Sequence, residues 1–152
     1  MWYRSVPEGA NYICHILSSA GFAAYIVGGA MRDLLMKRDP KDWDIATSAR
    51  PEAVIALFGK VVPTGIKHGT VTVVLPDGEY EVTTFRGEGA YSDGRRPDQV
   101  YFLDNVEQDL ARRDFTINAI AGNPLTGEIV DPFHGEADIE AHIIRAVGDP
   151  NA

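Results

Sequence analysis

The segment from Thr70 to Phe85 constrains the fold of this 152-residue chain more than any other stretch. Residues 70–75 and 80–85 are both rich in β-branched and aromatic side chains, and Asp77-Gly78 lies between them. An Asp-Gly pair between two such runs is a strong signal for the tight turn of a β-hairpin. The sequence therefore predicts an antiparallel pair of strands in the middle of the chain.

Helical and strand patterns are interspersed on both sides of this hairpin. Before it, we expect a helix over 11–20 that stops at Gly21, a strand at 24–27, a helix at 30–37, a strand at 42–45 and a helix at 51–58. After it, we expect an irregular loop at 86–98, a helical segment over 104–121 broken near Arg113-Asp114, strands at 128–130 and 143–147, and a helix near Ala137. This order predicts one α/β (α+β) domain over residues 1–152, built on a single sheet.

Composition places the chain among ordinary globular domains. Hydrophobic residues make up 45% of it, and no apolar run approaches the ~20 residues that a bilayer span requires. The N-terminus lacks the apolar core of an export signal. The single cysteine, Cys14, cannot form an internal disulfide, and its helical apolar surroundings predict a buried small hydrophobic residue. We therefore expect a cytoplasmic protein that does not enter a membrane.

The charge balance bears on nucleic-acid binding. The chain has 14 basic and 22 acidic residues, a formal net charge of −8. Such a chain lacks the overall positive charge expected of a nucleic-acid-binding protein. If it acts on nucleic acid, then a local basic patch, metal ions or segments outside this chain must offset the repulsion.

Asp42-Trp43-Asp44 is the first candidate site. On a strand, the two aspartates would point to one face and Trp43 to the other. Two neighbouring carboxylates suit Mg²⁺, which proteins bind through one or two carboxylates together with substrate phosphates. The alternative is two solvated acids on an edge strand beside a buried tryptophan, and this short pattern alone favours that alternative.

Gly28 and Gly29 end the predicted strand at 24–27 and precede a predicted helix. Glycines at such a junction let backbone N–H groups approach a phosphate closely. Arg32, a few residues into the helix, would add a positive charge next to a triphosphate. The alternative is a tight turn and a helix that carries a surface pair of Arg32 and Asp33.

Two further clusters carry groups that suit a nucleotide site. Glu81 is on the second strand of the hairpin, and it would add a third carboxylate if that strand neighbours Asp42 and Asp44; otherwise it is an exposed strand residue. The second cluster is formed by Arg112, Arg113, Asp114 and Asn118. Arginines suit phosphates, and Asp or Asn can hydrogen-bond to ribose hydroxyls, although Asp114 would also serve as an ordinary helix cap.

Taken in order, these motifs resemble the class II tRNA nucleotidyltransferases, a family that includes CCA-adding, CC-adding and A-adding enzymes and the bacterial poly(A) polymerases. The resemblance extends from about Tyr25 to Asp149. Besides the clusters above, it includes residues 44–49, 67–71, 81–86, 95–97 and 130–133.

The resemblance implies a polymerase-β-like head domain, a small mixed sheet backed by helices. Asp42 and Asp44 match the metal-binding carboxylates of the family, and Glu81 matches the third catalytic acid. By this likeness, two Mg²⁺ ions would lie between these acids and the triphosphate, one activating the 3′-hydroxyl of the RNA and the other stabilising the pyrophosphate that leaves. The implied reaction is nucleotidyl transfer.

The resemblance also assigns the nucleotide-binding residues. It implies that Gly28 and Gly29 contact phosphates, with Arg32 and Asp33 in the same motif. It implies that Asp114 recognises the ribose, supported by Arg113 and Asn118, and that Arg112 also binds the nucleotide. Residues 88–96 match a flexible loop. Asp33 and Asn118 would alternatively be structural caps.

In the family, a neck helix that selects the base and further domains that grip tRNA follow the head. Our chain ends about where the neck would begin, so we expect an isolated head that works with a separate neck and body. The implied substrates are CTP, ATP and the 3′ end of tRNA, and CCA addition is the general case. The alternatives are a module that binds Mg²⁺ and NTP but is inactive without the neck, and the head of a poly(A) polymerase.

Overall fold

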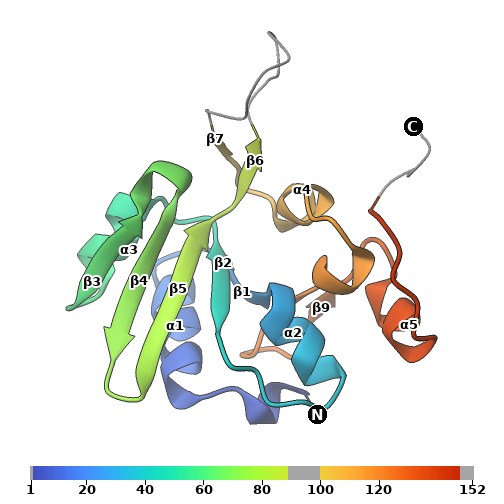
Figure 1. Cartoon of the computed structure of the whole chain (residues 1–152). Coiled ribbons are helices and arrows are strands. Elements are labelled where there is room, and N and C mark those ends of the chain that lie inside the picture. Colours follow the sequence, from blue (N-terminus) through green and yellow to red (C-terminus); the bar gives the residue numbers. More distant parts are fainter. Residues whose placement is uncertain (1, 89–99, 148–152) are drawn as a thin grey trace, which may run out of the picture.

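A mixed sheet of seven strands forms the centre of the computed structural model, which describes residues 2–88 and 100–147 (Figure 1). The order across the sheet is β3, β4, β5, β2, β1, β8, β9. The strands are Ala24–Val27 (β1), Asp44–Thr47 (β2), Val61–Gly65 (β3), Thr70–Leu75 (β4), Gly78–Thr84 (β5), Ala121–Gly122 (β8) and Ile129–Val130 (β9). Among the described strands, β2 and β5 form the one parallel pair, and all other pairs are antiparallel.

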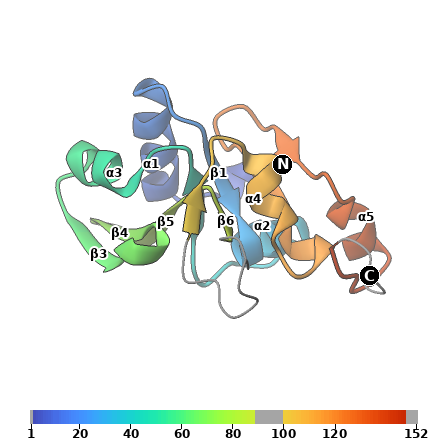
Figure 2. The same cartoon turned by 90° about the horizontal axis from the view of Figure 1, so that it is seen from above.

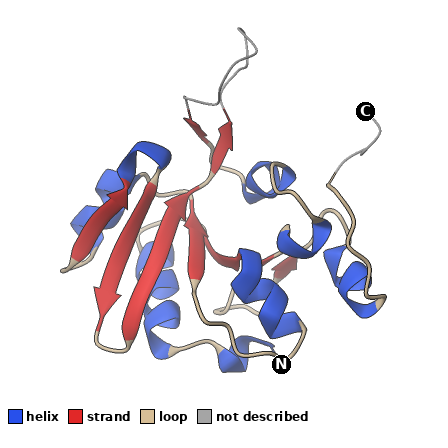
Figure 3. Ribbon diagram, viewed as in Figure 1, coloured by secondary structure: helices blue, strands red, loops and turns tan. Residues whose placement is uncertain are grey.

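Two short strands, β6 (Arg86–Glu88) and β7 (Val100–Phe102), form a second sheet beyond the end of β5 (Figure 3). The prediction of an irregular loop is therefore wrong for residues 86–88. The remainder of the predicted loop lies outside the described residues.

Helices cover the sheet. They are α1 (Glu8–Ser19), α2 (Gly28–Leu35), α3 (Pro51–Leu57), α4 (Val106–Ala111) and α5 (Gly135–Glu140), with short 3-10 helices η1 (Trp2–Ser5), η2 (Ile66–His68) and η3 (Thr116–Asn118). Seen from above, α1 and α3 lie side by side on one face of the sheet (Figure 2). No helix in the described part of the chain is both long and apolar enough to cross a membrane.

The strands contribute to two separate cores because successive side chains point to opposite faces. Ile26, Ile45 and Val82 belong to the larger core, together with residues of α1, α2 and α3. Their neighbours Val27 and Ala46 belong to a smaller core on the other face, which α4 closes. The second face is thus covered in part by α4, and the polar residues Asp44 and Glu81 lie on the strands nearby.

Several sequence predictions are confirmed. The strand at 24–27 has the predicted bounds, and the hairpin forms with β4 at 70–75 and β5 at 78–84. Helix α1 ends at Ser19, close to the predicted stop at Gly21, which has a φ of +92°. Cys14 is fully buried, and this burial raises the pKa of its thiol to about 12.

Other predictions are wrong, and pairing explains the differences. The strand predicted at 42–45 begins at Asp44, because Asp44 pairs with Val27 and β1 ends there. The helix predicted at 30–37 instead begins at Gly28, immediately after that strand.

The C-terminal third differs more from the prediction. The helical segment expected over 104–121 ends at Ala111 and continues as the 3-10 helix η3 and strand β8. The chain leaves the helical path because Phe115 forms a bridge with Ala146 and the Thr116 N–H donates to the carbonyl of Arg145, 2.9 Å away. The strand expected at 143–147 is reduced to this one bridge.

Candidate active site

Asp44 and Glu81 lie directly opposite each other on the parallel strands β2 and β5. The sequence-based hypothesis that these strands are neighbours is therefore confirmed. Asp44 is half-buried, and its pKa is raised to about 6, first by burial and then by its hydrogen bond to Glu81 and the negative charge of that residue. The two carboxyl groups thus lie side by side on the same face of the sheet. Without a bound cation, Asp44 binds a proton more readily than an isolated aspartate does.

Asp42 lies next to this pair although it is not on the strand. It is exposed in the bend before β2, and its negative charge contributes to the raised pKa of Asp44. Asp42, Asp44 and Glu81 line a hollow of about 430 Å³ together with Trp43, Thr72 and Glu79. The structure therefore brings the three predicted acids together.

Glu79 was not predicted as part of this group. It is exposed two residues before Glu81 on β5, so strand alternation places both on one face. That spacing was visible in the sequence. In residues 2–88 and 100–147, no three His, Cys, Asp or Glu side chains are already arranged around one point as metal ligands.

The Gly28-Gly29 turn lies beside the acids. Gly28 has a φ of +67°, which side-chain-bearing residues rarely adopt. A β-carbon added to Gly28 would stand 3.7 Å from Oδ2 of Asp44 and 3.5 Å from Nη1 of Arg113. The backbone of Gly28 thus lies between a carboxylate and a guanidinium, at the start of α2. The residue before the helix, Val27, provides no side-chain cap, so the first N–H groups of α2 are not capped by it.

Arg32 connects two motifs that are far apart in the sequence. Its Nη1 donates to Oδ1 of Asn118 at 3.0 Å, and its Nε and Nη2 donate to Oδ1 of Asp33 at 3.3 Å. A β-carbon added to Gly29 would lie 3.5 Å from its Nη2. Asp33 and Asn118 therefore hold the Arg32 guanidinium beside the glycine turn, and neither has the position of a helix cap.

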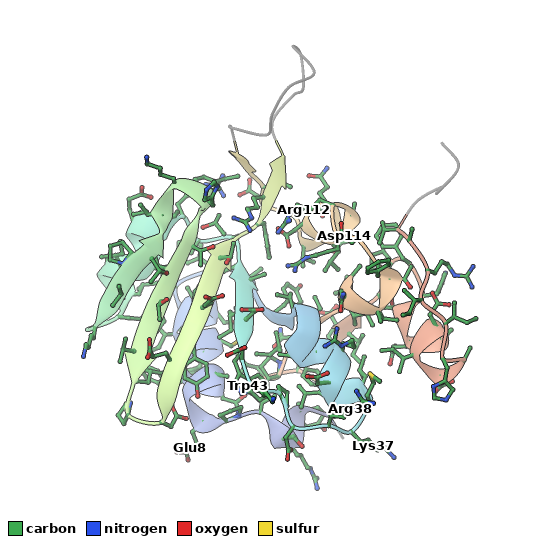
Figure 4. All side chains as sticks on the ribbon, in the orientation of Figure 1. Glu8, Lys37, Arg38, Trp43, Arg112 and Asp114 are labelled. Atoms are coloured by element: carbon green, nitrogen blue, oxygen red, sulfur yellow. The ribbon has the colours of Figure 1, made fainter. Side chains whose placement is uncertain are left out.

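Arg112 and Arg113 follow α4 and line the opposite side of the acidic pair. With Arg86 they enclose a smaller space of about 140 Å³ that also contacts Asp44 and Glu81. The nearby charge of Arg113 lowers the pKa of Asp44, against the larger effects that raise it. Figure 4 labels Trp43 beside the start of β2 and Arg112 at the end of α4.

Asp114 differs from the other predicted residues. It is exposed, it lines neither of these two spaces, and η3 has no side-chain cap that would explain it. Its carbonyl accepts a hydrogen bond from the N–H of Val147 at 3.0 Å. The backbone here is therefore fixed, while the carboxylate faces solvent.

Asp109 is a buried acidic residue that sequence reasoning missed. Its side chain lies on α4 with 1% exposure and pairs with Arg112 and Arg113. Spacings of three and four residues bring side chains together on a helix, so the sequence did contain the signal for these pairs.

A mixed sheet with paired acids at two central strands, a glycine turn and clustered arginines defines a nucleotidyltransferase type of head domain. The family described as the poly A polymerase head domain matches residues 24–145, and the chain belongs to this family.

Within this family, the chain is similar in sequence to CCA-adding enzymes. The chain is 57% identical over 138 residues to the CCA-adding enzyme of Lactobacillus helveticus, a match that covers 91% of this chain and 34% of that enzyme. It is 52% identical over 135 residues to the CCA-adding enzyme of Enterococcus faecalis, covering 89% of this chain and 33% of the relative. The chain thus spans about a third of the length of the curated relatives it matches.

Solved structures of CCA-adding enzymes are similar to this chain in fold. The CCA-adding enzyme of Bacillus stearothermophilus in complex with CTP superimposes with a TM-score of 0.82 at 50% identity, covering 91% of this chain and 33% of that one. The CCA-adding enzyme of Thermotoga maritima in complex with tRNA superimposes with a TM-score of 0.74 at 25% identity, covering 97% of this chain and 35% of that one.

Proposed function

We propose that this chain is the catalytic head of a template-independent RNA nucleotidyltransferase. It transfers nucleotides from CTP and ATP to the 3′ end of tRNA and releases pyrophosphate, as in CCA addition. The observation that carries the proposal is the placement of Asp44 opposite Glu81 on parallel strands, with the Gly28 turn beside them. Membership of the head-domain family and the CTP and tRNA complexes of similar proteins support it.

The acids have the chemistry to hold Mg²⁺. Asp42, Asp44 and Glu81 supply hard oxygen ligands, and burial together with the neighbouring acids raises the pKa of Asp44 to about 6. Asp42 and Asp44 would hold the metal, and phosphate oxygens of the substrate would complete its coordination. When bound, Mg²⁺ supplies charge neutralisation for the triphosphate and activation of the attacking hydroxyl.

The remaining site residues bind and orient the nucleotide. The uncapped start of α2 at Gly28 and Gly29 faces negative charge favourably, because its N–H groups lie at the positive end of the helix. Arg32, fixed by Asp33 and Asn118, adds a cation beside this turn. These groups would hold the triphosphate against the acids.

Arg112 and Arg113 would bind the nucleotide from the other side of the site, next to Asp44 and Glu81. Asp114 would recognise the ribose, because its solvent-facing carboxylate can accept hydrogen bonds from the ribose hydroxyls. In this assignment Arg113 and Asn118 support the sugar-binding segment. Replacing Asp114 with alanine should therefore weaken the preference for NTPs over dNTPs.

We place the protein in the cytoplasm, where tRNA is processed, and expect it to act with a neck and body segment. The length of the relatives and the net charge of −8 support a separate tRNA-gripping segment. Such a segment would supply base selection and most of the affinity for tRNA.

A primer-extension assay on the purified chain tests the proposal. The reaction contains Mg²⁺, tRNA that lacks its 3′ end, and each labelled NTP in turn. Incorporation should occur, and Asp42→Ala should abolish it. Asp39→Ala is the matched control, because Asp39 is an exposed aspartate in the same connection and should leave incorporation unchanged. Retained binding of Mg²⁺ and NTP without incorporation would instead identify a nucleotide-binding module that requires the neck for catalysis. Incorporation of ATP alone in long runs would identify a poly(A) polymerase head.

A further inference from the structure

Asp109 is almost completely withdrawn from solvent, although it is an acidic residue. Its Oδ1 accepts a hydrogen bond from the backbone N–H of Arg86 at 2.8 Å and lies 3.7 Å from Nε of Arg112. Its Oδ2 lies 3.5 Å from Nη2 of Arg113. One carboxylate thus contacts three arginine residues, all of which line the small space beside Asp44 and Glu81.

Packing alone does not account for a carboxylate at this position. The neighbouring residues of α4, Val106 and Leu110, pack in the smaller core with Phe85. Burying an ion pair costs desolvation energy, and a well-packed apolar residue often gives equal or greater stability. A functional role for Asp109 would therefore be exerted through the arginines that it contacts.

Arg113 links Asp109 to the candidate catalytic acids. Its Nη2 faces Asp109, whereas its Nη1 lies 3.5 Å from the place where a β-carbon on Gly28 would stand, and its charge reaches Asp44. The guanidinium is thus held between two carboxylates. If Asp109 did not attract it, the same cation would be drawn onto Asp44 and Glu81, where it would compete with a divalent cation.

We propose that Asp109 is a positioning residue of the nucleotide site, which holds the Arg113 guanidinium apart from the acidic pair so that it is available to the triphosphate. The inference rests on the proposed function, since it concerns the same site. Asp109 does not itself contact the nucleotide; it acts through Arg113.

The test is a double-mutant cycle on CTP binding, measured by calorimetry in the presence of Mg²⁺. Asp109→Asn keeps the shape of the side chain but removes its charge, and it should weaken CTP binding about tenfold, the loss expected for one misplaced charge-assisted hydrogen bond. In an Arg113→Ala background the same replacement should have almost no effect. Asp109→Glu, which keeps the charge, should recover part of the affinity.

Thr84→Val controls for loss of stability. Thr84 is 1% exposed and its hydroxyl donates to the carbonyl of Ala49 at 2.6 Å, so the change removes a buried hydrogen bond in which neither Asp109 nor Arg113 takes part. It should lower thermal stability without changing the Kd for CTP. Wild-type affinity in folded Asp109→Asn, or an equal loss in the Arg113→Ala background, would overturn the proposal.

A second readout does not require nucleotide. The Nε–H signal of Arg113 in an NMR spectrum should show an ordered side chain in the wild-type protein and in Thr84→Val, and a shifted or more mobile one in Asp109→Asn. An unchanged signal would refute the positioning role even if the chain binds no CTP. Failure of the wild-type chain to bind CTP would count against the proposed function, and the NMR result would still decide the role of Asp109.

Discussion

Asp44 and Asp109 are two carboxylates on neighbouring elements of the same site, and their surroundings are opposite. Asp44 faces Glu81 and lies near Asp42, so its nearest charged groups are mostly acids. Asp109 has a backbone N–H and two guanidinium groups within reach. The fold surrounds one carboxylate with cationic and N–H partners and places the other mainly among acids.

This difference indicates that Asp109 belongs to the structural support of the site, whereas Asp44 belongs to the candidate site itself. A buried carboxylate with cationic partners stabilises the arrangement of those partners, and its removal is destabilising. An uncompensated one opposes folding, and such a cost is recovered only when a cation binds. Arg113 lies between the two carboxylates, so it connects the scaffold to the site.

The largest effect expected from this comparison is on activity. Asp44→Ala should reduce Mg²⁺-dependent nucleotide transfer at least about a thousandfold, because it removes one of the carboxylates that we propose as ligands for the catalytic metal. Primer extension measures this loss. Transfer that stays within a factor of about ten of the wild-type rate would show that the metal assignment is wrong.

The second effect is on stability. Asp109→Ala should lower the free energy of unfolding by about 2–3 kcal/mol, because it removes a buried carboxylate that accepts a backbone hydrogen bond and pairs with two partly exposed guanidinium groups. Asp104→Ala is the matched control: Asp104 also pairs with an arginine, Arg50 at 3.4 Å, but its side chain is 86% exposed. The control should cost less than about 1 kcal/mol. Urea unfolding followed by circular dichroism measures both, and equal losses would contradict the comparison.

The third effect depends on pH. The pKa of Asp44 is raised from 3.8 to about 6 in the folded chain, so between these values the folded state holds a proton that the unfolded state has released. The free energy of unfolding therefore falls as pH rises through this window, and the deficit persists above it. Asp44→Asn lacks this titration. Without divalent cations, its stability relative to wild type should rise by about 1–2 kcal/mol between pH 3.5 and 7.5.

Urea titrations in the presence of EDTA test this directly. Added Mg²⁺ should stabilise the wild-type protein and have little effect on Asp44→Asn. A stability difference that is independent of pH would mean that Asp44 is compensated in the same way as Asp109.

The smallest effect concerns the turn next to both carboxylates. Gly28→Ala should cost about 1 kcal/mol, because a residue with a side chain is strained at a φ of +67°. It should also weaken nucleotide binding, since the added methyl group stands between Asp44 and Arg113. Gly59→Ala is the control, because Gly59 has open space around its added β-carbon. Thermal unfolding that shows the same change in both variants would contradict this.

Local signals in the sequence were enough to predict much of the fold. The hairpin followed from β-branched residues around Asp77-Gly78, and the strand at 24–27 followed from an apolar run ended by two glycines. Those signals depend only on residues that are neighbours in the sequence, so they can be recognised without knowledge of the tertiary structure. The acids of the site were also identifiable, because they lie within or next to these segments.

Long-range pairing determined what was missed. The strand of Asp44 starts where Val27 can pair with it, and the helical segment after α4 ends because Phe115 meets Ala146. The hydrogen bond that Asp109 accepts from the backbone N–H of Arg86 joins two elements that are distant in the sequence. No local pattern specifies such partners.

The parallel pairing of β2 with β5 has a consequence for how the protein folds. The two strands are separated in the chain by α3, β3 and β4, so Asp44 and Glu81 meet only after this whole crossover has closed. Contacts between distant parts of a chain form late, because the entropy of closing the loop must be overcome first. This pair of acids, which we propose as part of the Mg²⁺ site, should then be absent from the folding transition state. Mg²⁺ would slow unfolding while leaving the folding rate almost unchanged, so that the bound metal protects the native state kinetically.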